Sequence, residues 1–319
     1  MKIFITGNLG FIGTRLSELL IEKGFTVIGF DKEQESGSEK YECIHGNILD
    51  VELLNKSTKD NIDLIIHLAA EHKDNLHPKS LYYDVNVQGV QNLIDACTIN
   101  NINRIIFTST VSVYGLNPTK TSEESVPNPC NDYGKSKLQA EQILTKWWKK
   151  KKNRSLSIIR PTAVFGERNR GNIFNLMKQI TTDRFIKVGN GKNKKSIAYV
   201  GNLVEFISCS INNNDFCIVN YADKPDLTMN QLIALFYKFL SKKEKKISIP
   251  YCLGISAGYL FDLLSFIFRK QFSISSIRIK KFCINSIINT NELEQYNMKL
   301  PTPLYAAIER TIRFEFDKN

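Results

Sequence analysis

Short apolar runs alternate with amphipathic stretches over the first half of the chain. Five of the runs consist mainly of Val, Ile, Leu and Phe, which is typical of strands buried on both faces of a parallel sheet. They cover residues 2–6, 26–30, 64–68, 104–108 and 156–160. Segments with helical spacing of apolar residues, such as 11–23 and 81–97, separate them. The alternation predicts βαβ units, and therefore an α/β fold with a doubly wound parallel sheet.

A glycine-rich turn joins the first predicted strand to the first predicted helix. Gly7, Gly10 and Gly13 stand where a dinucleotide-binding Rossmann fold needs a tight turn, a close approach to a pyrophosphate and close helix–sheet packing. Asp31 ends the second strand about 20 residues later, where an acid accepts the ribose hydroxyls of NAD and repels the 2′-phosphate of NADP. Lys32 beside it weakens that discrimination. We expect NAD as the cofactor.

Two later segments fit the same ligand. Asn47 and Ile48 follow the presumed third strand, where a side-chain amide can reach the adenine edge. Leu68, Ala69 and Ala70 end the fourth strand, where small residues leave room for a cofactor. Packing alone is the alternative for both segments.

Composition changes near Arg168, where loops rich in Gly, Asn and Lys begin to interrupt shorter elements. We therefore expect an NAD-binding Rossmann core over residues 1–167. Residues 168–319 are expected to form a smaller, mainly substrate-binding domain that is interleaved with the core.

The segment 247–268 is strongly apolar and close to the length of a membrane span. Pro250, Gly254, Gly258 and Asp262 interrupt it, and a carboxylate in the middle of a span is costly in lipid. We expect a buried or interface helix without stable membrane insertion, and a peripheral membrane contact is the alternative. Basic residues flank the segment: Lys242, Lys243, Lys245, Lys246, Arg269 and Lys270.

The net charge of +11 fits nucleic acid, an acidic membrane surface or a diphosphate ligand equally well. The seven cysteines are scattered and form no CxxC pair, which argues against a disulfide framework or a metal site and for a reducing compartment. The first strand begins at Lys2 and leaves no room for a signal peptide, so a cytoplasmic protein is expected.

A hydroxyl-rich turn and a Tyr–Lys pair supply candidate chemistry. Thr110 follows the fifth strand, at the edge where parallel sheets bind ligands. Tyr133 and Lys137 are four residues apart and share one face of a helix. A nearby Lys and a positive nicotinamide ring both favour the phenolate of a tyrosine whose usual pKa is ~10. Taken alone, the hydroxyl-rich turn could be an ordinary turn after a strand, and the Tyr–Lys pair could lie on an ordinary surface helix.

These motifs together resemble the extended short-chain dehydrogenase/reductases of the NAD-dependent epimerase/dehydratase family. The matching segments run through most of the chain and are more specific for the family than for a substrate. They are TGNLGFIG at 6–13, HLAA at 67–70, NVQGVQNL at 86–93, TSTVSVYG at 108–115, YGKSK at 133–137, RPTAVFG at 160–166 and GNGKNKKSIAYVGN at 189–202.

The resemblance implies a role for each matched position. Thr110 falls on the catalytic Ser/Thr, Tyr133 on the general base and Lys137 on the lysine that holds the nicotinamide ribose. Asn86 is similar to an asparagine near the cofactor. Lys195 replaces an Arg that grips the diphosphate of a nucleotide, so a point charge stands in for a bidentate fork.

Asn172 and Asn175 are similar to positions that contact the nucleotide sugar, although Asn is also a good helix N-cap. The expected catalytic residues are Thr110, Tyr133 and Lys137, and the expected substrate-binding residues are Thr110, Asn172, Asn175 and Lys195. No metal site is expected. The expected cofactor-binding residues are Gly7, Asn8, Gly10, Phe11, Ile12, Gly13, Asp31, Lys32, Asn47, Ile48, Leu68, Ala69, Ala70, Asn86, Thr108, Tyr133, Lys137 and Pro161.

One departure from the family pattern bears on the reaction. At the turn that begins with Thr110, dehydratases of the family resemble TDEVYG, with an Asp and a Glu after the Thr. This chain has Val111 and Ser112 at those two positions. We therefore predict an NAD-dependent nucleotide-sugar epimerase acting at C4 of a UDP-sugar through a transient keto sugar. A 4-ketoreductase or dehydrogenase is the alternative, and a non-catalytic NAD-sensing or RNA-binding Rossmann protein is a third. The resemblance implies a homodimer, and we expect a nucleotide-diphosphate sugar rather than nucleic acid as partner.

Overall fold

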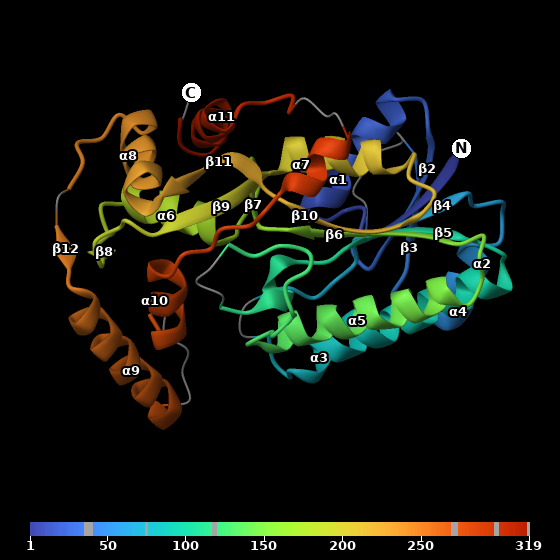
Figure 1. Ribbon diagram of the computed structural model, residues 1–319, viewed down its shortest axis with the longest axis horizontal. Helices are drawn as coiled ribbons and strands as arrows, with labels where there is room; N and C mark the ends of the chain where they lie inside the picture. The colour runs from blue at the N-terminus through green and yellow to red at the C-terminus, as the bar shows by residue number, and fades with distance from the viewer. Residues whose placement is uncertain are drawn as a thin grey trace.

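The computed structural model describes residues 1–34, 41–73, 76–116, 120–245, 247–268, 274–296 and 300–317. Within this part of the chain, seven parallel strands form one sheet in the order β10-β6-β5-β4-β1-β2-β3 (Figure 1). The strands are β1 (Lys2–Thr6), β2 (Thr26–Asp31), β3 (Glu42–His45), β4 (Leu64–His67), β5 (Arg104–Thr108), β6 (Ser155–Pro161) and β10 (Phe216–Tyr221). The predicted doubly wound sheet is confirmed.

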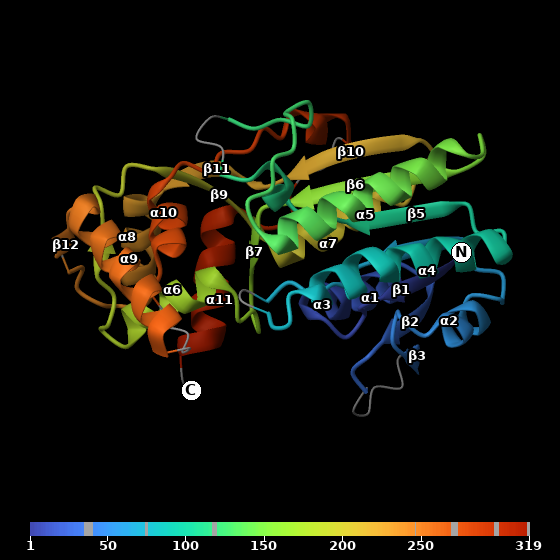
Figure 2. The same cartoon turned by 90° about the horizontal axis from the view of Figure 1, so that it is seen from below.

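Helices cover both faces of this sheet. On one face lie α1 (Phe11–Glu22) and α7 (Val200–Ser210), and on the other lie α2 (Val51–Ser57), α4 (Gly89–Ile99) and α5 (Asp132–Lys149) (Figure 2). The strand order reverses between β1 and β4, where the carboxyl ends of the strands open a crevice for a ligand. The fold therefore brings the glycine turn after β1 and the turns after β4 and β5 to one edge.

The helix predicted over 81–97 is not continuous. The structure divides it into α3 (Ser80–Tyr83), one π-helical turn called η1 (Asp84–Gln88) and α4. Apolar spacing alone does not distinguish a π turn from an α turn, and such turns occur often at functional sites. The π turn turns the side chain of Asn86 into the protein, where it is 1% exposed.

The remaining elements form a second layer beside the carboxyl ends of the first sheet. It contains the sheets β11-β9-β7 and β12-β8. Their strands are β7 (Ala163–Phe165), β8 (Lys187–Val188), β9 (Lys194–Tyr199), β11 (Asp223–Thr228) and β12 (Ser248–Ile249). The helices are α6 (Asn172–Thr181), α8 (Met229–Phe239), α9 (Tyr251–Phe268), α10 (Ser276–Cys283) and α11 (Leu304–Phe316).

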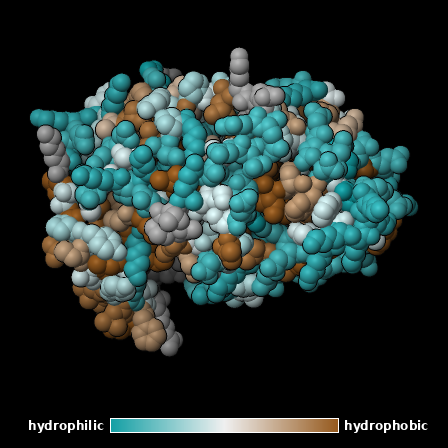
Figure 3. Space-filling model, in the orientation of Figure 1, coloured by the Kyte–Doolittle hydropathy of each residue, from teal (hydrophilic) through white to brown (hydrophobic). Residues whose placement is uncertain are grey.

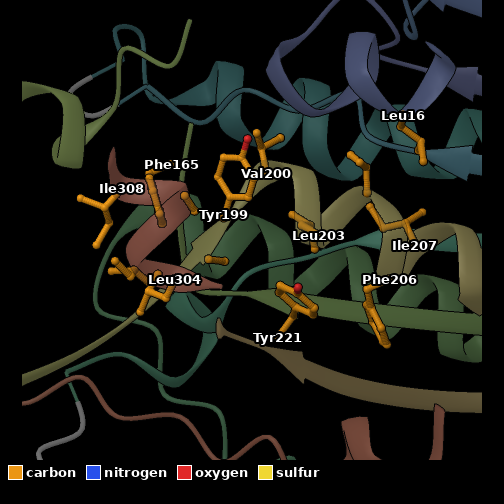
Figure 4. Close-up of a cluster of buried hydrophobic side chains, with 14 of the residues drawn as sticks. Leu16, Phe165, Tyr199, Val200, Leu203, Phe206, Ile207, Tyr221, Leu304 and Ile308 are labelled. Carbon is orange, nitrogen blue, oxygen red and sulfur yellow. The ribbon is translucent and has the colours of Figure 1, made fainter. Parts of the chain in front are cut away.

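One apolar cluster spans both layers. Figure 4 shows Leu16 of α1, Leu203 of α7 and Ile308 of α11 in it, and each of these side chains is 0% exposed. Because α7 and β10 follow Arg168 in the chain yet pack with or pair into the first sheet, the two parts of the chain cannot separate without opening this core.

Within the apolar segment 247–268, residues 251–268 form the helix α9, which is not buried. The expectation of a buried helix is therefore wrong, and its alternative, an interface helix, stays a prediction. Of the residues in α9, Gly254 and Gly258 alone are buried, which is 11% of them. By length and composition alone, α9 could cross a membrane. It projects from the second layer in Figure 1, and Figure 3 shows a hydrophobic surface there. Lys246, Arg269 and Lys270 lie outside the described residues.

Candidate active site

The glycine turn after β1 admits only glycine at two of its three positions. Gly7 has a φ of +75°, and a Cβ on it would lie 2.7 Å from the backbone nitrogen of Ala69. A Cβ on Gly13 would lie 2.1 Å from the carbonyl oxygen of Gly7. Gly10 is exposed, and its Cβ would meet only the Gly7 oxygen, at 3.2 Å. The turn therefore packs tightly underneath and is open at Gly10, as a pyrophosphate cradle requires.

Asp31 ends β2 beside this turn. Its carboxylate accepts hydrogen bonds from the backbone N–H groups of Leu9, at 2.9 Å, and Glu33, at 3.0 Å. The acid is thereby fixed at the crevice, where it can accept ribose hydroxyls with its remaining lone pairs. The Lys32 ammonium forms an ion pair with Glu71 instead of with Asp31.

Asn8 and Asn86 are placed differently from what their assignment as cofactor-binding residues suggests. The buried Asn8 amide donates to the Tyr41 hydroxyl at 3.0 Å, so its side chain supports the turn from below. The Asn86 amide accepts from the N–H of Glu71 at 2.8 Å and donates to the Ser136 hydroxyl at 2.9 Å. Asn86 therefore ties the loop after β4 to α5, and both asparagines act as positioning residues.

The other predicted cofactor residues lie at or just after the carboxyl ends of the strands, or at the start of α1. Among the described residues, the buried hydroxyl of Thr108 at the end of β5 has no hydrogen-bond partner. Because buried hydroxyls are normally paired, this orphan group fits a ligand in the crevice. Asn47 is exposed, whereas Ile48 is buried and packs beneath it. Half-buried residues at the crevice are Phe11, Ile12, Leu68, Ala69 and Ala70, and Pro161 is buried at the end of β6.

Thr110, Tyr133 and Lys137 come together at the start of α5. Thr110 caps a short 3₁₀ turn, η2 (Val111–Tyr114), and accepts the N–H of Ser112 at 3.1 Å. Its side chain also forms a hydrogen bond with Tyr133. A Cβ on Gly134 would lie 2.6 Å from the Ser112 carbonyl oxygen, so glycine there lets α5 approach η2 closely.

Burial changes the pKa values of the Tyr–Lys pair in a direction the sequence did not predict. Desolvation raises the pKa of Tyr133 to about 12, although its hydrogen bond with Thr110 lowers it. Desolvation also lowers the pKa of Lys137 to about 7, against the opposing charge of Glu141. The expected lowering of the Tyr133 pKa is therefore not found in the protein alone, because burial removes water from the charged forms of both side chains.

A buried ionic network missed by the sequence analysis supports this centre. The Arg160 guanidinium donates to both carboxylate oxygens of Glu141, at 2.9 and 2.5 Å, and to the Tyr114 hydroxyl at 2.6 Å. Glu141 also accepts the hydroxyl of Ser109 at 2.5 Å. The signal was the spacing Tyr133, Lys137, Glu141, which places three polar groups four residues apart on one helix face.

A second missed residue is His67, the last residue of β4. Its ring is 0% exposed, forms a hydrogen bond of 2.6 Å with the Thr6 hydroxyl and stacks on Phe107. Burial, together with the smaller effect of the Lys137 charge, lowers the pKa of His67 to about 3. The ring is therefore neutral, and the Lys137 ammonium lies 4.0 Å from the Phe107 ring centroid.

Of the predicted substrate residues, Thr110 follows β5, and the other three lie on the second layer. The Lys195 ammonium on β9 donates to the carbonyl oxygens of Lys281, at 2.6 Å, and Ile284, at 2.7 Å. Burial lowers the pKa of Lys195 to about 8. Asn172 and Asn175 are exposed at the start of α6. Gly171 is the N-cap of that helix, so Asn172 does not have the capping role that was its alternative.

An open pocket adjoins the turn that Thr110 caps. Tyr114 of η2 contributes to its wall, and the loop before α5 supplies most of the rest. Its lining residues are Tyr114, Leu116, Val126, Pro127 and Asn128.

Known proteins match this chain over most of its length. The model described as NAD dependent epimerase/dehydratase family matches residues 3–220. A protein of Escherichia coli O157:H7 named N-acetyl-alpha-D-glucosaminyl-diphospho-ditrans,octacis-undecaprenol 4-epimerase is 44% identical over 318 residues, covering 99% of this chain and 95% of that protein.

Solved structures share the fold at lower identity. UDP-glucose 4-epimerase of Thermotoga maritima with UDP-glucose has a TM-score of 0.79 at 19% identity, covering 98% of each chain. UDP-glucuronic acid 4-epimerase of Bacillus cereus with NAD has a TM-score of 0.77 at 21% identity, again covering 98% of each chain. The predicted Rossmann fold, NAD dependence and epimerase chemistry are confirmed: the chain belongs to the NAD dependent epimerase/dehydratase family.

Proposed function

We propose that this enzyme inverts C4 of an N-acetylhexosamine that is joined through a diphosphate to a polyprenol. The observation that carries this proposal is the 44% identity to the E. coli protein, because it extends over 99% of this chain, including the second layer that holds Lys195. A nucleotide-linked sugar, as the sequence predicts, is the second candidate, and structures solved with UDP-sugars support it at 19% identity.

The residues of the chain divide the proton chemistry between them. Tyr133 exchanges a proton with the 4-hydroxyl, and Thr110 holds the same oxygen through its side-chain hydroxyl. Lys137 lies one helical turn from Tyr133 and carries positive charge toward the phenol when it is protonated. The glycine turn and Asp31 would hold NAD, which when bound would supply a reversible hydride acceptor for C4 and a positive ring that favours the phenolate.

The residues after Thr110 support epimerisation over elimination of water. Val111 and Ser112 begin η2 and carry no carboxyl group that can protonate a departing hydroxyl. A ketoreductase would use the same Thr–Tyr–Lys set but would consume reduced cofactor. Retention of the cofactor through turnover therefore separates the two activities.

The test is direct assay of purified enzyme with N-acetylglucosaminyl diphosphate carried by a polyprenol, in detergent, and with UDP-N-acetylglucosamine in parallel. We expect the 4-epimer to form from the polyprenol substrate without added cofactor and without net NADH change, as measured by mass spectrometry, NMR and absorbance. Preferential turnover of the UDP-sugar would contradict the proposal of a polyprenol-linked substrate. Steady NADH consumption would contradict the proposal of an epimerase.

We also propose that the enzyme is a cytoplasmic homodimer. The family resemblance supports the dimer, and the seven cysteines, all free, suit a reducing compartment. Light scattering after size exclusion should give twice the 36.5 kDa of one chain, and a monomeric mass would contradict it.

A further inference from the structure

The helix α9 exposes a continuous apolar face. Leu253, Leu260, Leu263 and Ile267 recur at helical spacing along it, and each is more than half exposed. Phe266 beside them is 83% exposed. Contiguous exposed apolar surface of this kind marks a contact with another molecule or with a membrane.

The two glycines and the carboxylate of this segment lie on the opposite, packed side of α9, whereas Ser256 is exposed and donates its hydroxyl to the Cys252 carbonyl oxygen. A Cβ on Gly254 would lie 2.4 Å from Val188 of β8, and one on Gly258 would lie 2.8 Å from the Ser276 backbone. The Asp262 carboxylate accepts the N–H of Ser276 at the start of α10, at 3.2 Å. The interruptions that disfavoured a membrane contact in the sequence therefore attach α9 to the protein and leave its outer face apolar.

The sequence around α9 is basic, since residues 242–281 contain nine Lys or Arg and only two acidic residues. Among the described residues, Arg278, Lys280 and Lys281 lie on α10, which packs against α9. The Lys280 ammonium lies 5.1 Å from the ring centroid of Tyr259. An apolar helix face bordered by basic side chains is the arrangement of interfacial helices that bind anionic lipid.

We propose that α9 lies in the surface of a bilayer that contains acidic lipids and so docks the enzyme on the membrane. The helix lies along the surface rather than across the bilayer, because its glycine row and Asp262 hold it against β8 and α10. The leucine face enters the acyl boundary, and the basic side chains around it meet the headgroups.

This docking would place the substrate site next to the lipid, a point that rests on the proposed function. Lys195, the candidate diphosphate ligand, bonds the carbonyl oxygens of Lys281 and Ile284 at the C-terminal end of α10. The eight residues of α10 span about 12 Å. The helix α10 thus connects the carbonyl partners of Lys195 at its C-terminal end with the Gly258 and Asp262 contacts of α9 at its N-terminal end.

The test is flotation of the full enzyme with vesicles of phosphatidylcholine alone or with phosphatidylglycerol. We expect binding to the anionic vesicles, weakened by salt, and at least a tenfold loss of affinity in Leu260→Glu. The control is Ile99→Glu at the end of α4, which puts the same charge on a residue 63% exposed elsewhere. Thermal melting should show both variants folded.

Three outcomes would overturn the proposal: no vesicle binding by the unmodified enzyme, equal binding by Leu260→Glu, or self-association through α9 in place of vesicle binding. A water-soluble substrate with a short isoprenyl chain allows the epimerase activity to be measured without membrane docking. Leu260→Glu should keep its turnover of that substrate and lose turnover of the long-chain substrate in vesicles. Absence of turnover with every carrier would overturn the proposed function and leave the vesicle result standing.

Discussion

The edge of the Rossmann sheet and the α9–α10 pair use polar side chains for different purposes. At the sheet edge, Glu141, Arg160 and His67 are almost fully buried and fix the positions of groups that face a ligand. At α9, the polar Asp262 attaches a helix whose other face is apolar and exposed. In the first region, contacts within the protein therefore fix the polar groups. In the second, the apolar face of α9 lacks such contacts and is left for another molecule or a membrane to cover.

The largest effect is expected from Tyr133→Phe. Removal of the phenolic oxygen should lower turnover by about 10³-fold, because the proton of the 4-hydroxyl then has no acceptor, while cofactor remains bound. Turnover and the NAD content of the purified variant measure the two effects. Tyr82→Phe is the control, since its ring lies 6.4 Å from that of Tyr133 and its hydroxyl bonds the backbone. Near-normal turnover in Tyr133→Phe would show that Tyr133 does not exchange the proton of the 4-hydroxyl.

The glycine turn allows stability and cofactor binding to be separated. Gly13→Ala should lower the free energy of unfolding by about 1–3 kcal/mol, because its Cβ would lie 2.1 Å from a backbone oxygen. Gly10→Ala would meet only the Gly7 oxygen, at 3.2 Å, so it should cost less stability than Gly13→Ala while NAD affinity falls. Denaturant unfolding and NAD titration of both variants test this contrast, and equal stability of the two would contradict it.

The sequence predicted this region well because strands buried on both faces carry an unambiguous apolar pattern. The predicted starts or ends of β1, β2, β4, β5 and β6 fall within one residue of the structure. The sequence did not predict the direction of side chains. Asn8 and Asn86 were assigned to the cofactor, yet their amides form hydrogen bonds with protein groups. The pKa shift of Tyr133 also depends on burial, which no motif states.

The α9 segment was misjudged for a related reason. Composition shows that 247–268 is apolar but not whether protein or lipid covers it, since both are nonpolar environments. The Gly254–Gly258–Asp262 spacing of four residues places these residues on one face, and only the structure shows that this face packs against α10.

The buried ion pair tests how strongly the sheet edge depends on its interior. Glu141→Gln should cost about 3 kcal/mol of unfolding free energy, because the Arg160 charge is left buried without its partner. Glu205→Gln is the matched control, since it removes a surface pair with Lys23 and should cost less than about 1 kcal/mol. Similar losses of unfolding free energy in the two variants would show that the buried pair contributes no more to stability than the surface pair.

The pH dependence of stability offers a smaller effect in the same region. His67 has its pKa lowered to about 3, so the unfolded chain binds a proton that the folded protein does not between that value and about 6.5. Stability should therefore fall as pH falls through this window, and His67→Gln should remove on the order of 1 kcal/mol or more of that fall. Urea unfolding across the window measures it, with the exposed His45→Gln as control. An unchanged slope in His67→Gln would contradict the prediction.

The smallest effect is expected at α9, and it completes the comparison. Leu260→Ala should change the free energy of unfolding by less than about 0.5 kcal/mol, because that side chain is 55% exposed and leaves no cavity. Leu203→Ala, the same substitution in the cluster shared by both layers, should cost about 2–5 kcal/mol. A large cost at Leu260 in unfolding without lipid would mean that α9 is held by the protein core. Its apolar face would then have a structural rather than a docking role.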